Sequence, residues 1–149
     1  MFLPRTAVLL TLVVAGVACR KKFEVLPEGA KQITRSDTNE AGESGAIALR
    51  EYRFALADAK GMTNTFACET RSYPDVESAK KTAKKSIAER PQSGEEKALA
   101  RFAASGRSVW LWHGRDLAWC MLTTPRVADI GAAMQPVLAK FKKKFEENP

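Results

Sequence analysis

The sequence predicts an α+β domain in which two hairpins form a four-stranded antiparallel sheet and two amphipathic helices pack on one face of it. Three observations lead to this class: two pairs of segments that each have the pattern of a β-hairpin, a helical pattern between the pairs, and a second helical pattern near the end of the chain. The 149 residues suffice for one domain with one core, which we place at residues 46–149. The expected order is strand, strand, helix, strand, strand, helix.

The first expected hairpin joins the segment around Tyr52 to the segment around Cys68. In "ALREYRFAL", Tyr52 and Phe54 alternate with charged residues, which favours a half-buried strand, although a helix competes because apolar residues also fall at helical spacing. After the turn signal "DAKG", the segment "TNTFACETRSY" places Phe66 and Cys68 on one side and charged residues on the other.

The clearest hairpin is "RSVWLWHGRDLAWCMLTT". With Gly114 and Arg115 as a two-residue turn, Trp110 lies opposite Trp119. The residues that we expect on the core side of the whole sheet are Tyr52, Phe54, Leu56, Phe66, Val109, Leu111 and Leu122.

Two further segments have helical periodicity. "PDVESAKKTAKKSIAER" begins with Pro74 and acidic residues, which favour a helix N-terminus, and "PQSG" ends it. In "VADIGAAMQPVLAKFKKKFEE" we expect Pro136 to kink or divide the helix. The segment "EEKALARFAAS" between them fits a short helix or an irregular strand. The apolar stripe of the last helix consists of Ile130, Met134, Val137, Phe141 and Phe145.

The amino terminus predicts an export signal over residues 1–18. Arg5 precedes the uncharged run "TAVLLTLVVAGVA", which as a helix spans roughly 20 Å against about 30 Å of hydrocarbon. Gly16 and Ala18 supply the small side chains that a signal peptidase needs before Cys19. The alternative is an uncleaved membrane anchor.

The four residues Gly16, Val17, Ala18 and Cys19 resemble the lipobox of bacterial lipoproteins. The resemblance implies that Cys19 receives diacylglycerol and becomes the mature N-terminus. Gly16 stands where Leu is usual, so cleavage by the general signal peptidase, giving a soluble exported protein, stays open. In Gram-negative lipoproteins an Asp after the cysteine favours the inner membrane. Arg20 lacks that signal, so the resemblance implies the periplasmic face of the outer membrane in such a host.

The cysteine count agrees with this interpretation. The chain has three cysteines, and an odd number in an exported protein leaves one thiol without a partner. If Cys19 carries lipid, Cys68 and Cys120 remain as a pair, and a disulfide between them would contribute about 4 kcal/mol at most. The alternative is two unbonded buried thiols. No Cys or His spacing indicates a metal, and we expect no metal and no cofactor.

Residues 19–45 are mostly polar or small, so we expect a flexible tether. Its first residues, Arg20, Lys21 and Lys22, would contact an anionic membrane surface. The net charge of +7 favours anionic partners in general, such as phospholipid head groups, polyanionic envelope polymers or nucleic acid, and a protein of the envelope is a further candidate partner. Export argues against nucleic acid. The lysines at 80–85 and 140–144 are interpreted as solvated helix faces, with docking to anionic surfaces as the alternative.

One group of residues suggests a ligand. On the sheet face opposite the core, tryptophans lie beside arginines and would stack on sugar rings, peptide side chains or lipid groups. The alternative is that the tryptophans are buried under the C-terminal helix or the unassigned segment. The expected ligand face consists of Trp110, Trp112, Trp119, Arg53 and Arg71.

No pattern in the chain indicates catalysis. His113 lies at the expected hairpin turn, where we expect exposure and no nucleophile within reach, and the common hydrolase and nucleotide-binding motifs do not occur. We therefore expect a non-catalytic cell-envelope lipoprotein, a lipid-anchored binding or scaffolding domain. The alternatives are a soluble periplasmic or secreted binding protein, and a small enzyme whose groups converge only in three dimensions.

Overall fold

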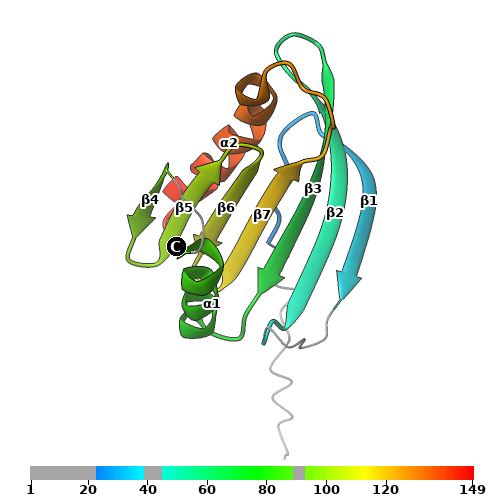
Figure 1. Ribbon diagram of the computed structural model, residues 1–149. Helices are drawn as coiled ribbons and strands as arrows, with labels where there is room; N and C mark the ends of the chain where they lie inside the picture. The colour runs from blue at the N-terminus through cyan, green and yellow to red at the C-terminus, as the bar shows by residue number, and fades with distance from the viewer. Residues whose placement is uncertain (1–22, 39–44, 89–92) are drawn as a thin grey trace, which may run out of the picture.

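A computed structural model describes residues 23–38, 45–88 and 93–149. Within these residues one antiparallel sheet has seven strands, in the spatial order β1-β2-β3-β7-β6-β5-β4 (Figure 1). The elements are β1 (Lys31–Thr38), β2 (Ala48–Ala57), β3 (Thr63–Ser72), α1 (Val76–Ala88), β4 (Ser93–Lys97), β5 (Ala100–Ser105), β6 (Ser108–His113), β7 (Asp116–Leu122) and α2 (Ile130–Glu146). No helix in this part of the chain is long and apolar enough to cross a membrane.

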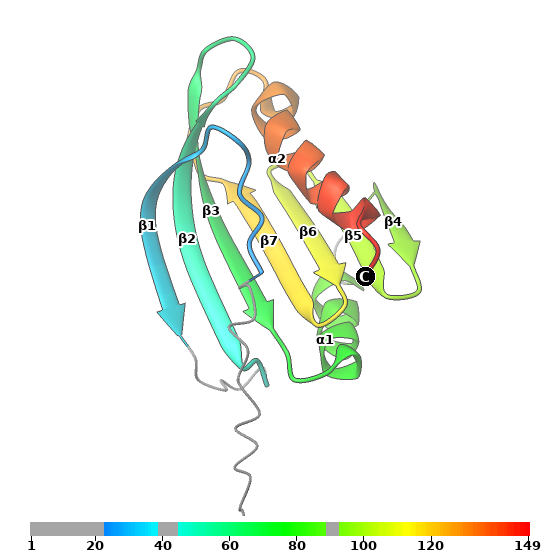
Figure 2. The ribbon, with the colours of Figure 1, turned by 180° about the vertical axis from the view of Figure 1, so that it is seen from behind.

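The expected four-stranded sheet with both helices on one face is therefore wrong. The sheet has three more strands, and α1 and α2 lie on opposite faces of it (Figures 1 and 2). The physical reason is visible in β6, which is apolar on both sides. Val109 and Leu111 pack with the core that includes α2, whereas Trp112 packs with α1.

Residues 23–38 belong to the folded domain, so the expectation of a flexible tether over residues 19–45 is wrong for this part. The segment before β1 crosses the same face of the sheet as α2 (Figure 2). Val25 is fully buried there, and its carbonyl accepts a hydrogen bond from the Tyr52 hydroxyl at 3.0 Å. Residues 19–22 and 39–44 lie outside the described residues.

A buried arginine explains how so polar a segment folds. The Arg50 side chain of β2 is only 5% exposed and donates to Asp37 of β1 at 2.8 Å and to Glu24 at 3.0 Å. A buried guanidinium needs such partners, because an unpaired charge in the interior is costly. All eight residues of β1 are exposed, so the strand has no alternating pattern that sequence analysis detects.

The unassigned segment contains β5, which pairs with β4 on one side and β6 on the other. Ala100 and Ala103 are fully buried although they lie on opposite faces of β5. Because small residues are buried on both faces, the segment shows no period of two.

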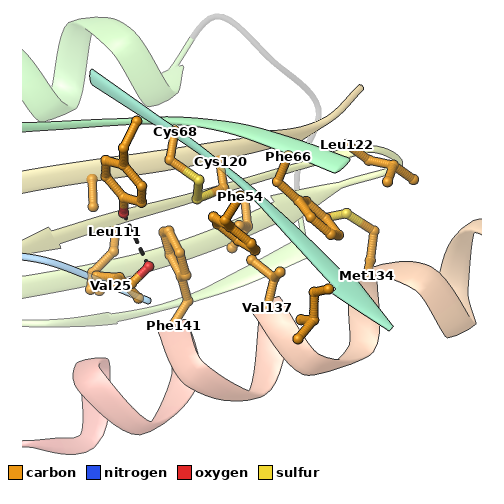
Figure 3. Packing of buried hydrophobic residues seen from close by; sticks show 14 of the residues in the cluster. Val25, Phe54, Phe66, Cys68, Leu111, Cys120, Leu122, Met134, Val137 and Phe141 are labelled. Atoms are coloured by element: carbon orange, nitrogen blue, oxygen red, sulfur yellow. Dashed lines mark hydrogen bonds between the residues drawn. A yellow bond between two sulfur atoms is a disulfide. The ribbon is translucent and has the colours of Figure 1, made fainter. Parts of the chain in front are cut away.

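The main core lies between the sheet and α2. The Phe54 and Phe66 rings stack across β2 and β3 with centroids 5.1 Å apart, beside Val137 and Phe141 of α2 (Figure 3). Every residue that we expected on the core side is buried. Four of the five stripe residues of α2 are buried as well, and Ile130 is half-buried. The helix continues through Pro136 without division, with its stripe packed on the sheet before and after the proline.

The sheet consists of two meanders. β1, β2 and β3 form one, β4 to β7 form the other, and they meet where β3 pairs with β7. Cys68 and Cys120 lie directly opposite each other at this seam and form a disulfide within the core (Figure 3). The expected register of the β6–β7 hairpin is confirmed, with Trp110 opposite Trp119. Gly114 in its turn has φ of 61°, which favours glycine.

Candidate functional site

A cleft of about 410 Å³ lies between α1 and the part of the sheet that α1 does not cover. β3, β6 and β7 supply its floor and α1 supplies one wall. Its polar and aromatic lining residues are Glu69, Arg71, Thr82, Ser86, Ser108, Trp110 and Trp119. We call this hollow the tryptophan cleft.

The tryptophans of the cleft come from a cross-strand pair. Trp110 of β6 and Trp119 of β7 lie opposite each other, and both are half-buried. Aromatic residues paired in this way hold each other in position and still present ring surface to a ligand.

Trp112 does not belong to the accessible face, contrary to our expectation. Its side chain is only 2% exposed because α1 covers it, and its indole N–H donates to the Gly114 carbonyl at 2.7 Å. The alternative expectation, that the tryptophans are buried, is thus correct for Trp112, although the helix that covers it is α1 and not α2. The Lys80 ammonium lies 5.9 Å from the centroid of the ring.

A charged pair lies on the floor of the cleft. The Arg71 Nε donates to the Glu69 carboxylate two residues away on β3. Partial burial disfavours the charged form of Arg71, but the hydrogen bond and the charge of Glu69, together with smaller contributions from Tyr73, outweigh it and raise the pKa of Arg71 above its ordinary value. The guanidinium is therefore a fixed positive group beside the tryptophans.

Arg53 lies apart from the tryptophan cleft. It is exposed on β2 and lines a second hollow of about 320 Å³, which Trp119 and Glu69 also line. The two hollows therefore adjoin at Trp119. Our expected ligand face is thus divided between a cleft, a neighbouring depression and one buried residue.

Sequence analysis missed the contribution of α1. Thr82 and Ser86 line the cleft, one helical turn apart. The Thr82 hydroxyl donates to the Ser78 carbonyl at 3.0 Å. The only signal for them is the presence of two hydroxyl residues at a spacing of four, which becomes informative once the helix is known to lie on this face.

His113 is half-buried and not freely exposed as expected. Its ring stacks on Phe23 with centroids 6.2 Å apart, and its Nε2 lies 3.0 Å from the Glu147 carbonyl oxygen. These contacts fasten the N-terminal segment and the end of α2 to the β6–β7 turn. The residues Cys19, Arg20, Lys21 and Lys22 lie outside the described residues.

Among residues 23–38, 45–88 and 93–149, no group of three or more His, Cys, Asp or Glu side chains is arranged to hold a metal ion. Comparisons with protein-family models, curated proteins and solved structures found no match to the chain. The disulfide is compatible with an exported protein. A function can be inferred from three features of the molecule: the disulfide, the tryptophan cleft and the N-terminal sequence.

Proposed function

We propose that this chain is a non-catalytic cell-envelope lipoprotein, anchored by lipid at Cys19, whose folded domain binds another envelope component in the tryptophan cleft. The observation that carries the anchor is the disulfide between Cys68 and Cys120. It uses two of the three cysteines and leaves Cys19, which follows the lipobox-like residues Gly16 to Ala18. Two or more acyl chains, as in a diacylglyceryl group with an added fatty acid, make such anchoring stable.

The tryptophan cleft supports the binding function. Trp110 and Trp119 present flat apolar surface, and Arg71 with Glu69 supplies a fixed pair of charges beside it. Thr82, Ser86 and Ser108 add hydroxyl groups to the lining. Saccharides fit such a cleft, because their rings stack on tryptophan and their polar groups hydrogen-bond to the rim. Peptide side chains are the other ligand class that fits.

The anchor is tested by incorporation of palmitate and by mass spectrometry of the mature N-terminus. We expect the chain to be labelled by palmitate in its native host, and the first residue of the mature protein to be Cys19 with diacylglyceryl and acyl groups attached. The Cys19→Ala variant should lose the label completely, because the thioether to lipid forms only at that sulfur.

A double variant, Cys68→Ala with Cys120→Ala, is the matched control, and it should keep the label. A mature protein that begins with an unmodified Cys19 would contradict the lipid anchor and favour the soluble exported binding protein. Palmitate label that persists in Cys19→Ala would contradict it as well.

A further inference from the structure

The length of chain between Cys19 and the folded domain is short. Phe23 is the first described residue and its ring stacks on His113, while the Lys144 ammonium lies 5.5 Å from the centroid of the same ring. Four residues of fully extended chain span at most about 14 Å. If Cys19 carries lipid, as the proposed function holds, the surface around Phe23 stays within that distance of the head groups.

The surface at this end is an open groove of about 1040 Å³. It lies at the end of the sheet where the N-terminal segment, the β6–β7 turn and the last turns of α2 meet (Figure 2). We call it the basal groove, and the lining residues that matter here are Phe23, His113, Arg115, Lys140, Lys143 and Lys144.

The charge of the basal groove is positive after its internal pairs are considered. Among its acidic residues, Glu24 pairs with Arg50 and Glu147 pairs with Lys144. Asp116 accepts from the Ser72 hydroxyl at 2.6 Å and keeps its charge, which is smaller than the summed charge of Arg115, Lys140 and Lys143 in the same groove. Within the described residues, Lys140 and Lys143 form no salt bridge, and the charge of Lys140 contributes only a minor part of the lowering of the Glu147 pKa, after Lys144.

We propose that the basal groove faces the bilayer and that Lys140 and Lys143 bind the phosphate groups of anionic phospholipids. A lysine close to an anionic bilayer strengthens binding by about fivefold, and salt weakens the attraction. The short connection holds these lysines near the surface, so the domain has a fixed orientation in which the tryptophan cleft is open on the opposite face of the sheet from α2.

The test is lysine acetylation of the lipidated full chain, read residue by residue by mass spectrometry. The protein is compared in non-ionic detergent, in phosphatidylcholine vesicles, and in vesicles that contain 30 mol% phosphatidylglycerol. We expect acetylation of Lys140 and Lys143 to fall about fivefold on the anionic vesicles relative to detergent. Lys31 and Lys60 are internal controls and should be unaffected, because Lys60 lies beside Asp129 at the opposite end of α2 and Lys31 begins β1 at that same end of the sheet (Figure 1).

Charge-reversal variants sharpen the test, with Lys144 as the reporter. In Lys140→Glu with Lys143→Glu, the protection of Lys144 by anionic lipid should disappear, whereas Lys31→Glu with Lys60→Glu should leave it unchanged. If anionic vesicles lower the acetylation of lysines at both ends of a lipidated protein equally, relative to detergent, the proposed orientation alone is overturned. An unmodified Cys19 in the mature protein overturns the orientation and the proposed function together.

Discussion

The two faces of the sheet are built differently. On the face that carries α2, large side chains such as Phe54, Phe66 and Phe141 close a continuous core that also includes Val25 from the N-terminal segment. On the other face, α1 packs through small residues and covers only part of the sheet. Large interlocking side chains give most of the stability, and the small contact area of α1 leaves room for the tryptophan cleft.

The largest expected difference between the faces concerns two aromatic residues. Phe141→Ala should lower the free energy of unfolding by about 3–5 kcal/mol, since it leaves a cavity in the closed core. Trp119→Ala should cost about 1 kcal/mol, because that ring is half-buried and borders the cleft. Urea denaturation measures both, and equal losses would contradict the division between a stabilising face and a binding face.

The Trp119→Ala variant can also be tested by quenching of tryptophan fluorescence. Iodide in water should quench part of the tryptophan fluorescence of the wild-type protein, and Trp119→Ala should remove much of that accessible part. Trp112 is buried and should not contribute to it. Phe141→Leu is a milder control for the core, with an expected loss of about 1–1.5 kcal/mol.

The next largest effect concerns the disulfide at the seam. Replacing Cys68 and Cys120 together by alanine should lower the free energy of unfolding by about 2–4 kcal/mol, because the bond closes a loop with a sequence separation of 52. Thermal unfolding of wild type and variant, each with and without reductant, measures the difference. Reductant should destabilise only the wild type, and an equal response of both proteins would mean that the bond is not formed.

The smallest effect compares two buried tyrosines on opposite faces. Tyr52→Phe should cost about 1 kcal/mol, because its hydroxyl donates to the Val25 carbonyl at 3.0 Å. Tyr73→Phe should cost less than Tyr52→Phe, since in the described structure its buried hydroxyl forms no hydrogen bond of ordinary geometry and interacts only with the Arg71 side chain. Urea denaturation at neutral pH should separate the two variants, and a larger loss in Tyr73→Phe would contradict this assignment.

The Tyr52 pair also has a pH dependence. Burial raises the pKa of Tyr52 well above its ordinary value, so the folded protein keeps the proton when the unfolded chain has lost it. The contribution of Tyr52 is therefore complete below about pH 10 and decreases as the pH rises toward the folded-state pKa. Stability measured from pH 8 to pH 11 should fall less steeply above pH 10 in Tyr52→Phe than in the wild type, and parallel curves would contradict this.

Much of the sheet could be predicted from alternation. The β6–β7 hairpin was correct in register because a two-residue turn at Gly114 and Arg115 fixes which residues of the two apolar segments lie opposite each other. β1 was missed because all of its side chains are exposed, and the placement of the helices was wrong because β6 is apolar on both faces. A single sequence carries no information on which apolar face a given helix covers.

The candidate site could be predicted only in part. Trp110, Trp119 and Arg71 were predicted from their shared face of the sheet, and they do line one cleft. Thr82 and Ser86 were missed because they reach the cleft only through the packing of α1 against the sheet. Their role follows from a tertiary contact, which no local pattern in residues 76–88 encodes.

The seam between the two meanders has a consequence for folding. Within each meander, neighbouring strands are also neighbours in sequence, so hairpins form over short loops and at little entropic cost. Among the strands of the described residues, only the pairing of β3 with β7 brings together strands that are distant along the chain. We therefore expect this pairing to limit the folding rate of the reduced chain. A chain that unfolds with Cys68 and Cys120 still joined keeps the two halves together, and should refold faster than the reduced chain.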